Sequence, residues 1–154
     1  MKRAVRSPYP RATSARGLKV NDANFLHEFR HESETGFLYF VHNGTMTSQD
    51  ATTMLSFYKE QVSAGDAGFI IADNRKAKTI TSEARKVCVN AGLPGEIYLA
   101  LFGGSFAFRG VAQLLFSAMK MTTGSFEGTA VVDEAEARAW LTEKRRSYLA
   151  RKAR

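Results

Sequence analysis

Two short, entirely apolar runs most strongly limit what this chain can fold into. Residues 69–72 (FIIA) lie between a glycine and an aspartate, and residues 97–102 (IYLALF) are followed by two glycines. A strand without polar alternation is expected to be buried on both faces, as the strands of a parallel sheet are. Parallel neighbours need a crossover, and residues 82–91 supply one, since their small and apolar residues recur at helical spacing. The two runs therefore predict an α/β domain.

The segment before these runs predicts an antiparallel hairpin. Residues 24–30 alternate as a strand, although their apolar residues would also share one face of a short helix. A turn at 33–36 leads to an aromatic strand at 37–41, which Asn43-Gly44 is expected to end. The hairpin would add an antiparallel edge to the sheet.

Capping residues and glycines set the expected bounds of the helices. The predicted helices run from Thr47 to Gly65, from Thr81 or Ser82 to Gly92, from Ser105 to about Thr122, and from Asp133 into the C-terminus, with a loop at 73–81 and a last strand at 128–132. The resulting fold class is α/β, a mixed, largely parallel five-stranded sheet with an antiparallel edge hairpin and about four helices. We expect one domain, at residues 21–143.

The formal net charge of +7 lies at the two ends of the chain. Residues 1–20 and 144–154 each hold six cations and no acid, which leaves ten of the 22 cations against all 15 acids between them. We expect a flexible basic tail at 1–20 and a basic extension of the last helix at 144–154. Both ends could make weak electrostatic contact with nucleic acid or an anionic membrane.

Targeting signals and cysteine content bear on the compartment. No run reaches the roughly 20 apolar residues that a membrane helix needs, and no apolar segment follows the basic N-terminus. The single cysteine, Cys88, excludes an intramolecular disulfide and falls on the predicted core stripe of its helix. The sequence therefore predicts a cytoplasmic protein.

One stretch matches a zinc-peptidase motif. His27-Glu28-x-x-His31 has the H-E-x-x-H spacing, in which two histidines bind zinc and the glutamate activates water. The histidines meet at one metal only on a helix, where they lie about 6 Å apart, because a strand separates them by roughly 13 Å. The segment is expected before a hairpin turn, so we treat His27 and His31 as a decoy and predict no metal and no other cofactor.

A glycine pair offers a second chemical candidate. Gly103-Gly104-Ser105 stands at a strand-to-helix junction with Arg109 one turn later, a place where free amides and a helix N-terminus can hold an anion. Two glycines at such a junction more often make a tight turn. The sequence shows no nucleophile elbow and no paired carboxylates at a suggestive spacing, so no catalytic residues are predicted.

The expected helix after Ser105 is apolar on two sides. Besides a regular core stripe it carries Phe106, Leu114 and Met121 on the other side, with Phe116 flanking them. A second subunit in a homodimer, a partner protein or an apolar ligand would cover this face.

The body of the chain, from about residue 24 to 144, resembles the STAS-type domains, those of sulphate transporters and anti-sigma factor antagonists. The likeness is to a divergent bacterial group of small stand-alone proteins, related also to CRAL-TRIO lipid-binding folds. It rests on the element order and on three stretches, FLYFVHNGTMTSQD, FIIADNRKAKTITSEARK and VVDEAEARAWL. The resemblance implies a regulatory, non-enzymatic module.

The resemblance also implies site residues. In anti-sigma factor antagonists a serine at the start of a helix is phosphorylated as a switch, and the matching residue here is Ser82, with Thr81 where the family has an aspartate. A phosphate at that point would meet exposed helix amides. The surrounding partner-recognition candidates are Asp73, Arg75, Lys76, Lys78 and Arg85.

These observations favour a protein-interaction module, with a homodimer as one form in which it would act. The alternatives are a small apolar-ligand or lipid-binding protein and, third, a zinc hydrolase built on His27, Glu28 and His31.

Overall fold

The structure is a computed structural model that describes residues 24–62, 66–93 and 95–154. The expected tail at 1–20 and the expected helix end at Gly65 lie outside these ranges. The elements in chain order are β1 (Glu28–His31), β2 (Leu38–Met46), α1 (Ser48–Gln61), β3 (Ala67–Ile80), α2 (Ser82–Val89), β4 (Glu96–Phe102), α3 (Phe106–Thr123), β5 (Phe126–Val131) and α4 (Glu134–Lys152).

The five strands form one sheet in the order β1-β2-β3-β4-β5. β1 pairs antiparallel with β2, and every later pair is parallel. The predicted fold class, a mixed and largely parallel five-stranded sheet with an antiparallel edge hairpin and four helices, is confirmed. The first segment, which the sequence left ambiguous between strand and helix, is a strand.

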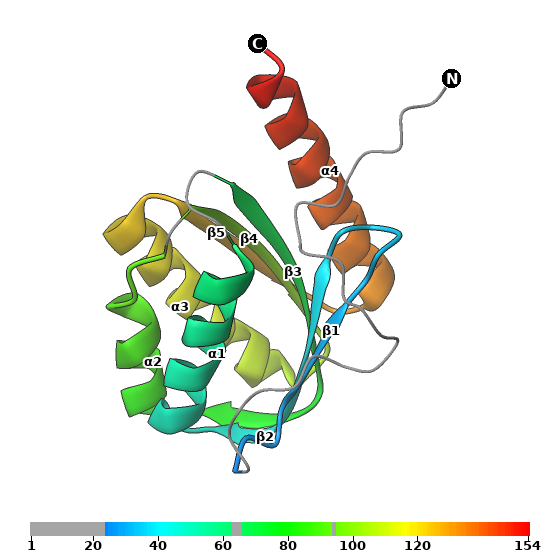
Figure 1. The fold of residues 1–154 in the computed structure, drawn as a ribbon. Helices are drawn as coiled ribbons and strands as arrows, with labels where there is room; N and C mark the ends of the chain where they lie inside the picture. The colour runs from blue at the N-terminus through cyan, green and yellow to red at the C-terminus, as the bar shows by residue number, and fades with distance from the viewer. Residues whose placement is uncertain (1–23, 63–65, 94) are drawn as a thin grey trace.

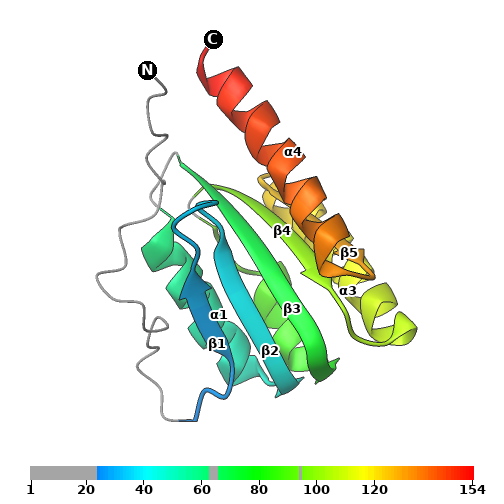
Figure 2. The same cartoon turned by 90° about the vertical axis from the view of Figure 1, so that its right-hand side faces the viewer.

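The helices divide unequally between the two faces of the sheet. Each of α1, α2 and α3 connects two adjacent parallel strands, and the strand order always advances in the same direction. Right-handed crossovers therefore place all three on one face. Figures 1 and 2 show α4 alone on the other face, crossing β3, β4 and β5 and leaving β1 and β2 without a covering helix.

Short polar side chains start all four helices. Thr47 and Asp50 form a capping box at α1, Thr81 caps α2, Ser105 caps α3 and Asp133 caps α4. Each accepts a hydrogen bond from a backbone amide of the first turn, which would otherwise be unpaired. Within the described part of the chain, no helix is both long and apolar enough to cross a membrane.

Two strands are longer than the sequence predicts. β2 continues through Asn43-Gly44 to Met46, and β3 continues to Ile80, so the expected end of the first strand and the expected loop at 73–81 are wrong. The polar second halves of the two strands pair with each other, with two register shifts along the way. Backbone pairing holds these segments extended although neither has apolar alternation.

The sheet separates two hydrophobic cores. The larger lies under α1, α2 and α3 and includes Cys88, whose thiol pKa is raised to about 11 by burial. The smaller lies under α4, where Ala137 and Leu141 are fully buried. Figure 2 shows one helix, α4, over this face, whereas α1, α2 and α3 cover the other.

The basic end of α4 is helical, and most of its cations are paired with acids. The ion pairs are Lys144–Glu127, Arg146–Glu143, Arg151–Glu96 and Lys152–Asp66. Three of them join α4 to the rest of the domain, so much of the positive charge at 144–154 faces acids of the body.

Candidate functional site

The carboxyl edge of the parallel strands is where α/β folds usually bind ligands. β4 ends at Phe102, opposite Asp73, whereas β3 continues for seven further residues beside β2 alone. This extension carries exposed Arg75, Lys76 and Lys78. Together with half-buried Arg85 at the start of α2, these three residues are called the basic edge below.

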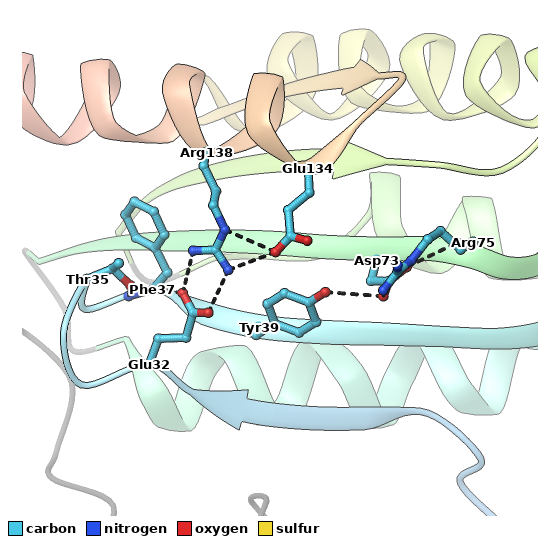
Figure 3. Close-up of polar contacts among 8 residues, drawn as sticks. All are labelled: Glu32, Thr35, Phe37, Tyr39, Asp73, Arg75, Glu134 and Arg138. Atoms are coloured by element: carbon cyan, nitrogen blue, oxygen red, sulfur yellow. Dashed lines mark hydrogen bonds and ion pairs between the residues drawn. The ribbon is translucent and has the colours of Figure 1, made fainter.

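A buried carboxylate fixes the first cation of the basic edge. Asp73 accepts hydrogen bonds from the backbone amide of Arg75 at 3.1 Å, from its Nε at 3.0 Å and from its Nη2 at 2.7 Å. The hydroxyl of Tyr39 donates a fourth, at 3.1 Å. Figure 3 shows Tyr39 and Arg75 converging on Asp73 from neighbouring strands.

The electrostatics of this group favour fixed charges. Burial alone would raise the pKa of Asp73, but the hydrogen bonds and charge of Arg75, with the bond from Tyr39, leave it lower than usual. Burial, with the adjacent Asp73 carboxylate, raises the pKa of Tyr39 to about 12. Four donors occupy the acceptor capacity of the carboxylate, so Asp73 has no lone pair left for a proton-transfer role.

The guanidinium of Arg75 is available on its other side. Its side chain is 65% exposed although its partner Asp73 is 8% exposed. It lies over Phe102, with Cζ 5.6 Å from the ring centroid, and borders a hollow of about 360 Å³ lined by Val41, Asp73, Arg75 and Lys76. A guanidinium held in one orientation beside a second cation suits a carboxylate or phosphate group.

Above Tyr39 a second ion-pair network joins α4 to the hairpin. Arg138 donates two hydrogen bonds to Glu32, at 2.9 and 2.7 Å, and two to Glu134. The bonds from Arg138 hold the pKa of Glu32 below its usual value. Arg30 covers the ring of Tyr39 at 4.5 Å. Side chains, among them Arg138 of α4, thus extend the cover over the part of β2 that the α4 helix itself does not cross, as Figure 3 shows for Arg138 and Glu32.

Ser82 and Thr81 have separate roles at the start of α2. Thr81 accepts the hydrogen bond from the Ala84 amide at 3.1 Å and is the N-cap, so Ser82 is not needed for capping. Ser82 is exposed, and its hydroxyl donates to Glu83 at 3.0 Å. Arg85 reaches back to the carbonyl of Ile80 at 2.7 Å. The Ser82 hydroxyl therefore lies at the surface, near the basic edge in the chain.

The polar groups of the glycine turn are largely used within the fold. The Gly103 amide donates to the carbonyl of Val132, Ser105 caps α3, and Arg109 donates to the carbonyl of Gly104 at 2.6 Å. Both glycines have φ near +78°, and a Cβ on Gly103 would lie 2.9 Å from Cγ of Arg75. Glycine is required here because the end of β4 turns against the backbone of β3.

The H-E-x-x-H residues do not form a zinc-peptidase site. Glu28 and His31 lie on β1, so the spacing of one helical turn that the motif requires is not formed. His27 instead packs against His42, with ring centroids 5.0 Å apart. In the described part of the chain, no group of three or more histidine, cysteine, aspartate or glutamate side chains is arranged to hold a metal ion.

His27 and His42 belong to a buried polar cluster under α1. The Asn43 amide donates to Nδ1 of His27, whose Nε2 lies 3.3 Å from Asp50, within ion-pair distance but without good hydrogen-bond geometry. His42 contacts Oδ1 of Asn74 through Nδ1 at 2.9 Å, and an amide oxygen only accepts, so Nδ1 carries the proton. Burial lowers the pKa of both histidines, that of His42 to about 4. Both rings are therefore neutral near pH 7.

The core beside His42 contains a small cavity. Its volume is about 60 Å³, and its walls are mostly apolar, with Met46, Met54 and Met119 among them. An engineered cavity that admits benzene measures about 150 Å³. The cavity in this conformation is therefore too small for an acyl chain.

The apolar candidates on α3 separate into two groups. Phe106, Leu114 and Met121 are 86%, 74% and 89% exposed, whereas Phe116 is 6% exposed. Phe116 packs on Phe126 and on Gly128, where a side chain would collide with its ring. Phe116 is therefore a core residue that also lines the small cavity, and it does not belong to the exposed face on which the sequence placed it.

No family model and no curated protein matches the sequence.

Proposed function

We propose that this protein is a non-enzymatic, STAS-like regulatory module that binds a protein partner through the basic edge. The observation that carries the proposal is the fixed guanidinium of Arg75, which is held by a buried carboxylate and exposed beside Lys76 and a hollow. Holding a cation in place before binding reduces the entropy lost on association. The partner surface that fits this edge is acidic.

The chemistry of the site supports binding more than catalysis. Asp73 is saturated by four donors, and Tyr39 keeps its proton because its pKa lies near 12. Glu134 and Glu32 are both bonded to Arg138. At the basic edge, Asp73 and Arg75 are thus paired in fixed positions, an arrangement that suits recognition of an acidic group by the exposed side of Arg75.

Ser82 is the proposed switch. Because Thr81 caps α2, a phosphate on the exposed Ser82 hydroxyl would not remove the cap. It would add about −1.5 to −2 charge one helical turn from Arg85, where it would compete with an acidic partner for that cation of the basic edge. Phosphorylation would therefore weaken binding.

Charge reversal tests the docking surface. We would purify the tagged full chain with its bound proteins from its own cells and quantify them by mass spectrometry. Lys76→Glu/Lys78→Glu is compared with Lys59→Glu/Arg154→Glu, a control with the same change in charge at exposed positions elsewhere. A protein retained by the wild type and the control but lost from the basic-edge variant supports the proposal. Equal recovery of every protein from both variants would overturn it.

Ser82 is tested with the partner found in this way. Ser82→Asp, which mimics the added charge, should weaken binding several-fold, and Ser82→Ala should leave it unchanged. If Ser82→Asp binds as tightly as the wild type, Ser82 is not the switch, and the docking surface stands or falls on the lysine variants alone.

A further inference from the structure

The outer face of α3 presents three large apolar side chains to solvent. Phe106, Leu114 and Met121 are 86%, 74% and 89% exposed and are called the α3 stripe. At 100° per residue they fall within one quarter of the helix circumference, and from first to last they span about 22 Å along the axis. Aligned exposed apolar groups of this size mark a surface that contacts something other than water.

The residues around the α3 stripe are small or basic. Gly110 and Ser117, both exposed, lie between its members on the same side of the helix. The only charged residues of α3 are Arg109 and Lys120, and the helix has no acid. Exposed apolar side chains flanked by cations, with no acid on the helix, are complementary to the interface of an anionic bilayer.

A second copy of the chain fits this face less well. A stable interface needs about 800 Å² from each partner, so the α3 stripe would have to be joined in it by its charged neighbours Arg109 and Lys120. Antiparallel pairing of two α3 helices would also bring Arg109 of one copy to Lys120 of the other, and like charges repel. Strand β5, which lies beside the helix at the edge of the sheet, could otherwise pair with a strand of a second copy. Its Ala130 amide, however, already donates to Oε1 of Gln113 in α3 at 3.1 Å.

We infer that the α3 stripe is a peripheral membrane-binding surface that takes anionic phospholipid. The helix lies parallel to the bilayer, with Phe106, Leu114 and Met121 in the boundary between headgroups and acyl chains. Arg109 and Lys120 then face the anionic headgroups. Association by three side chains and two cations is weak and reversible, so lipid composition and salt control it. This inference concerns a different surface from the basic edge and does not depend on it.

Vesicle co-sedimentation of the full chain tests the inference. The vesicles contain phosphatidylcholine alone or with 30% phosphatidylglycerol. We expect binding to the mixed vesicles and much weaker binding to phosphatidylcholine. Phe106→Ser/Met121→Ser should reduce the partition coefficient about tenfold or more, because it removes two of the three inserted side chains. Leu26→Ser, at a residue 73% exposed beside β1, is the matched control and should bind as the wild type does.

Three results would overturn the inference. One is the absence of binding to mixed vesicles. Another is unchanged binding of the double variant, which would place the contact on other cations of the chain. The third, in size-exclusion chromatography with light scattering, is a wild-type dimer that the double variant abolishes, which would make the α3 stripe an interface between copies. Circular dichroism of each variant shows that the fold is retained.

Discussion

The two faces of the sheet hold their helices by different forces. Under α1, α2 and α3 lies a continuous apolar core, with His27, His42 and Asn74 as its buried polar residues. Under α4 only a narrow apolar strip is buried, and ion pairs along the helix tie it to strands and loops. Apolar packing is not screened by salt, whereas exposed ion pairs are. The attachment of α4 should therefore respond to solution conditions more than that of the other helices.

The largest expected effect comes from the apolar contact of α4. Leu141 is fully buried, and Leu141→Ala should lower the free energy of unfolding by about 2–4 kcal/mol. Leu114→Ala, on the exposed face of α3, should change it by less than about 0.5 kcal/mol. Urea denaturation of both variants measures the difference. A loss below about 1 kcal/mol for Leu141→Ala would mean that ion pairs alone hold α4.

On the opposite face of the sheet, under α1, α2 and α3, the contribution of His42 to stability should depend on pH. His42 has a pKa of about 4 when folded and about 6.5 when unfolded, so the unfolded state binds more protons between these values. The contribution of neutral His42 to the free energy of unfolding is therefore complete above pH 6.5 and decreases by about 2 kcal/mol between pH 7 and 5. Below pH 4 protonation of His42 lowers the free energy no further. His27, whose pKa is also lowered, acts in the same direction.

Urea denaturation at several pH values, with titration of the His42 ring by NMR, checks this effect. His42→Asn does not titrate but keeps an N–H donor for Asn74. We expect its stability to change less than that of the wild type over the same interval. An equal pH dependence in the variant would assign the effect to other groups.

Two glycines on either side of α3 should give effects of opposite sign. A Cβ on Gly128 would lie 2.7 Å from Cγ of Phe116, so Gly128→Ala should cost about 1–3 kcal/mol. A Cβ on Gly110 would meet nothing within 4 Å, and Gly110→Ala should stabilise the helix by up to about 1 kcal/mol. Thermal melts of the two variants compare the packed and the open side of α3. A neutral Gly128→Ala would show that Phe116 can move aside.

The regular elements could be predicted from the sequence because their signals are local. The capping pair at Thr47 and Asp50 and the apolar runs of β3 and β4 need no information from distant residues. The polar half of β3 could not be predicted, because residues 74–80 are held extended by pairing with β2, which is a tertiary contact. For the same reason Phe116 was misplaced, since only the absence of a side chain at Gly128 makes room for its ring.

The candidate site was only partly predictable for a related reason. Asp73 and Arg75 were expected together on a loop, but residues two apart share a face only on a strand. A prediction of a strand at this segment would have placed the Asp73 and Arg75 side chains on the same face of the sheet. The partner Tyr39, 34 residues away, and the Arg138–Glu32 contact, 106 residues apart, leave no mark in local sequence. Such pairs follow from the topology of the sheet.

The smallest expected effect concerns the ion pairs of α4. Arg138 joins α4 to Glu32 in the hairpin through two hydrogen bonds, so Arg138→Met should cost about 1 kcal/mol at low salt and less in 1 M NaCl. Arg146→Met is the matched control, because its pair with Glu143 is exposed and stays within the same helix. Arg146→Met should leave the free energy of unfolding essentially unchanged, because a fully exposed ion pair contributes little.

The contribution of the Arg138–Glu32 pair also depends on pH, but here the folded state favours the charged form of the titrating group, whereas for His42 it favours the neutral form. Arg138 lowers the folded pKa of Glu32, so the contribution of the pair is full above the unfolded pKa near 4.5 and is lost as pH falls through the folded value. Arg138→Met should remove this loss, so wild type and variant should converge in stability at acid pH. Urea denaturation of both proteins at pH 7 and 3, at low and high salt, measures the convergence. A difference that persists at pH 3 and in 1 M NaCl would show that Arg138 holds α4 through packing of its side-chain stem. The two faces of the sheet would then differ only in how much apolar area they bury.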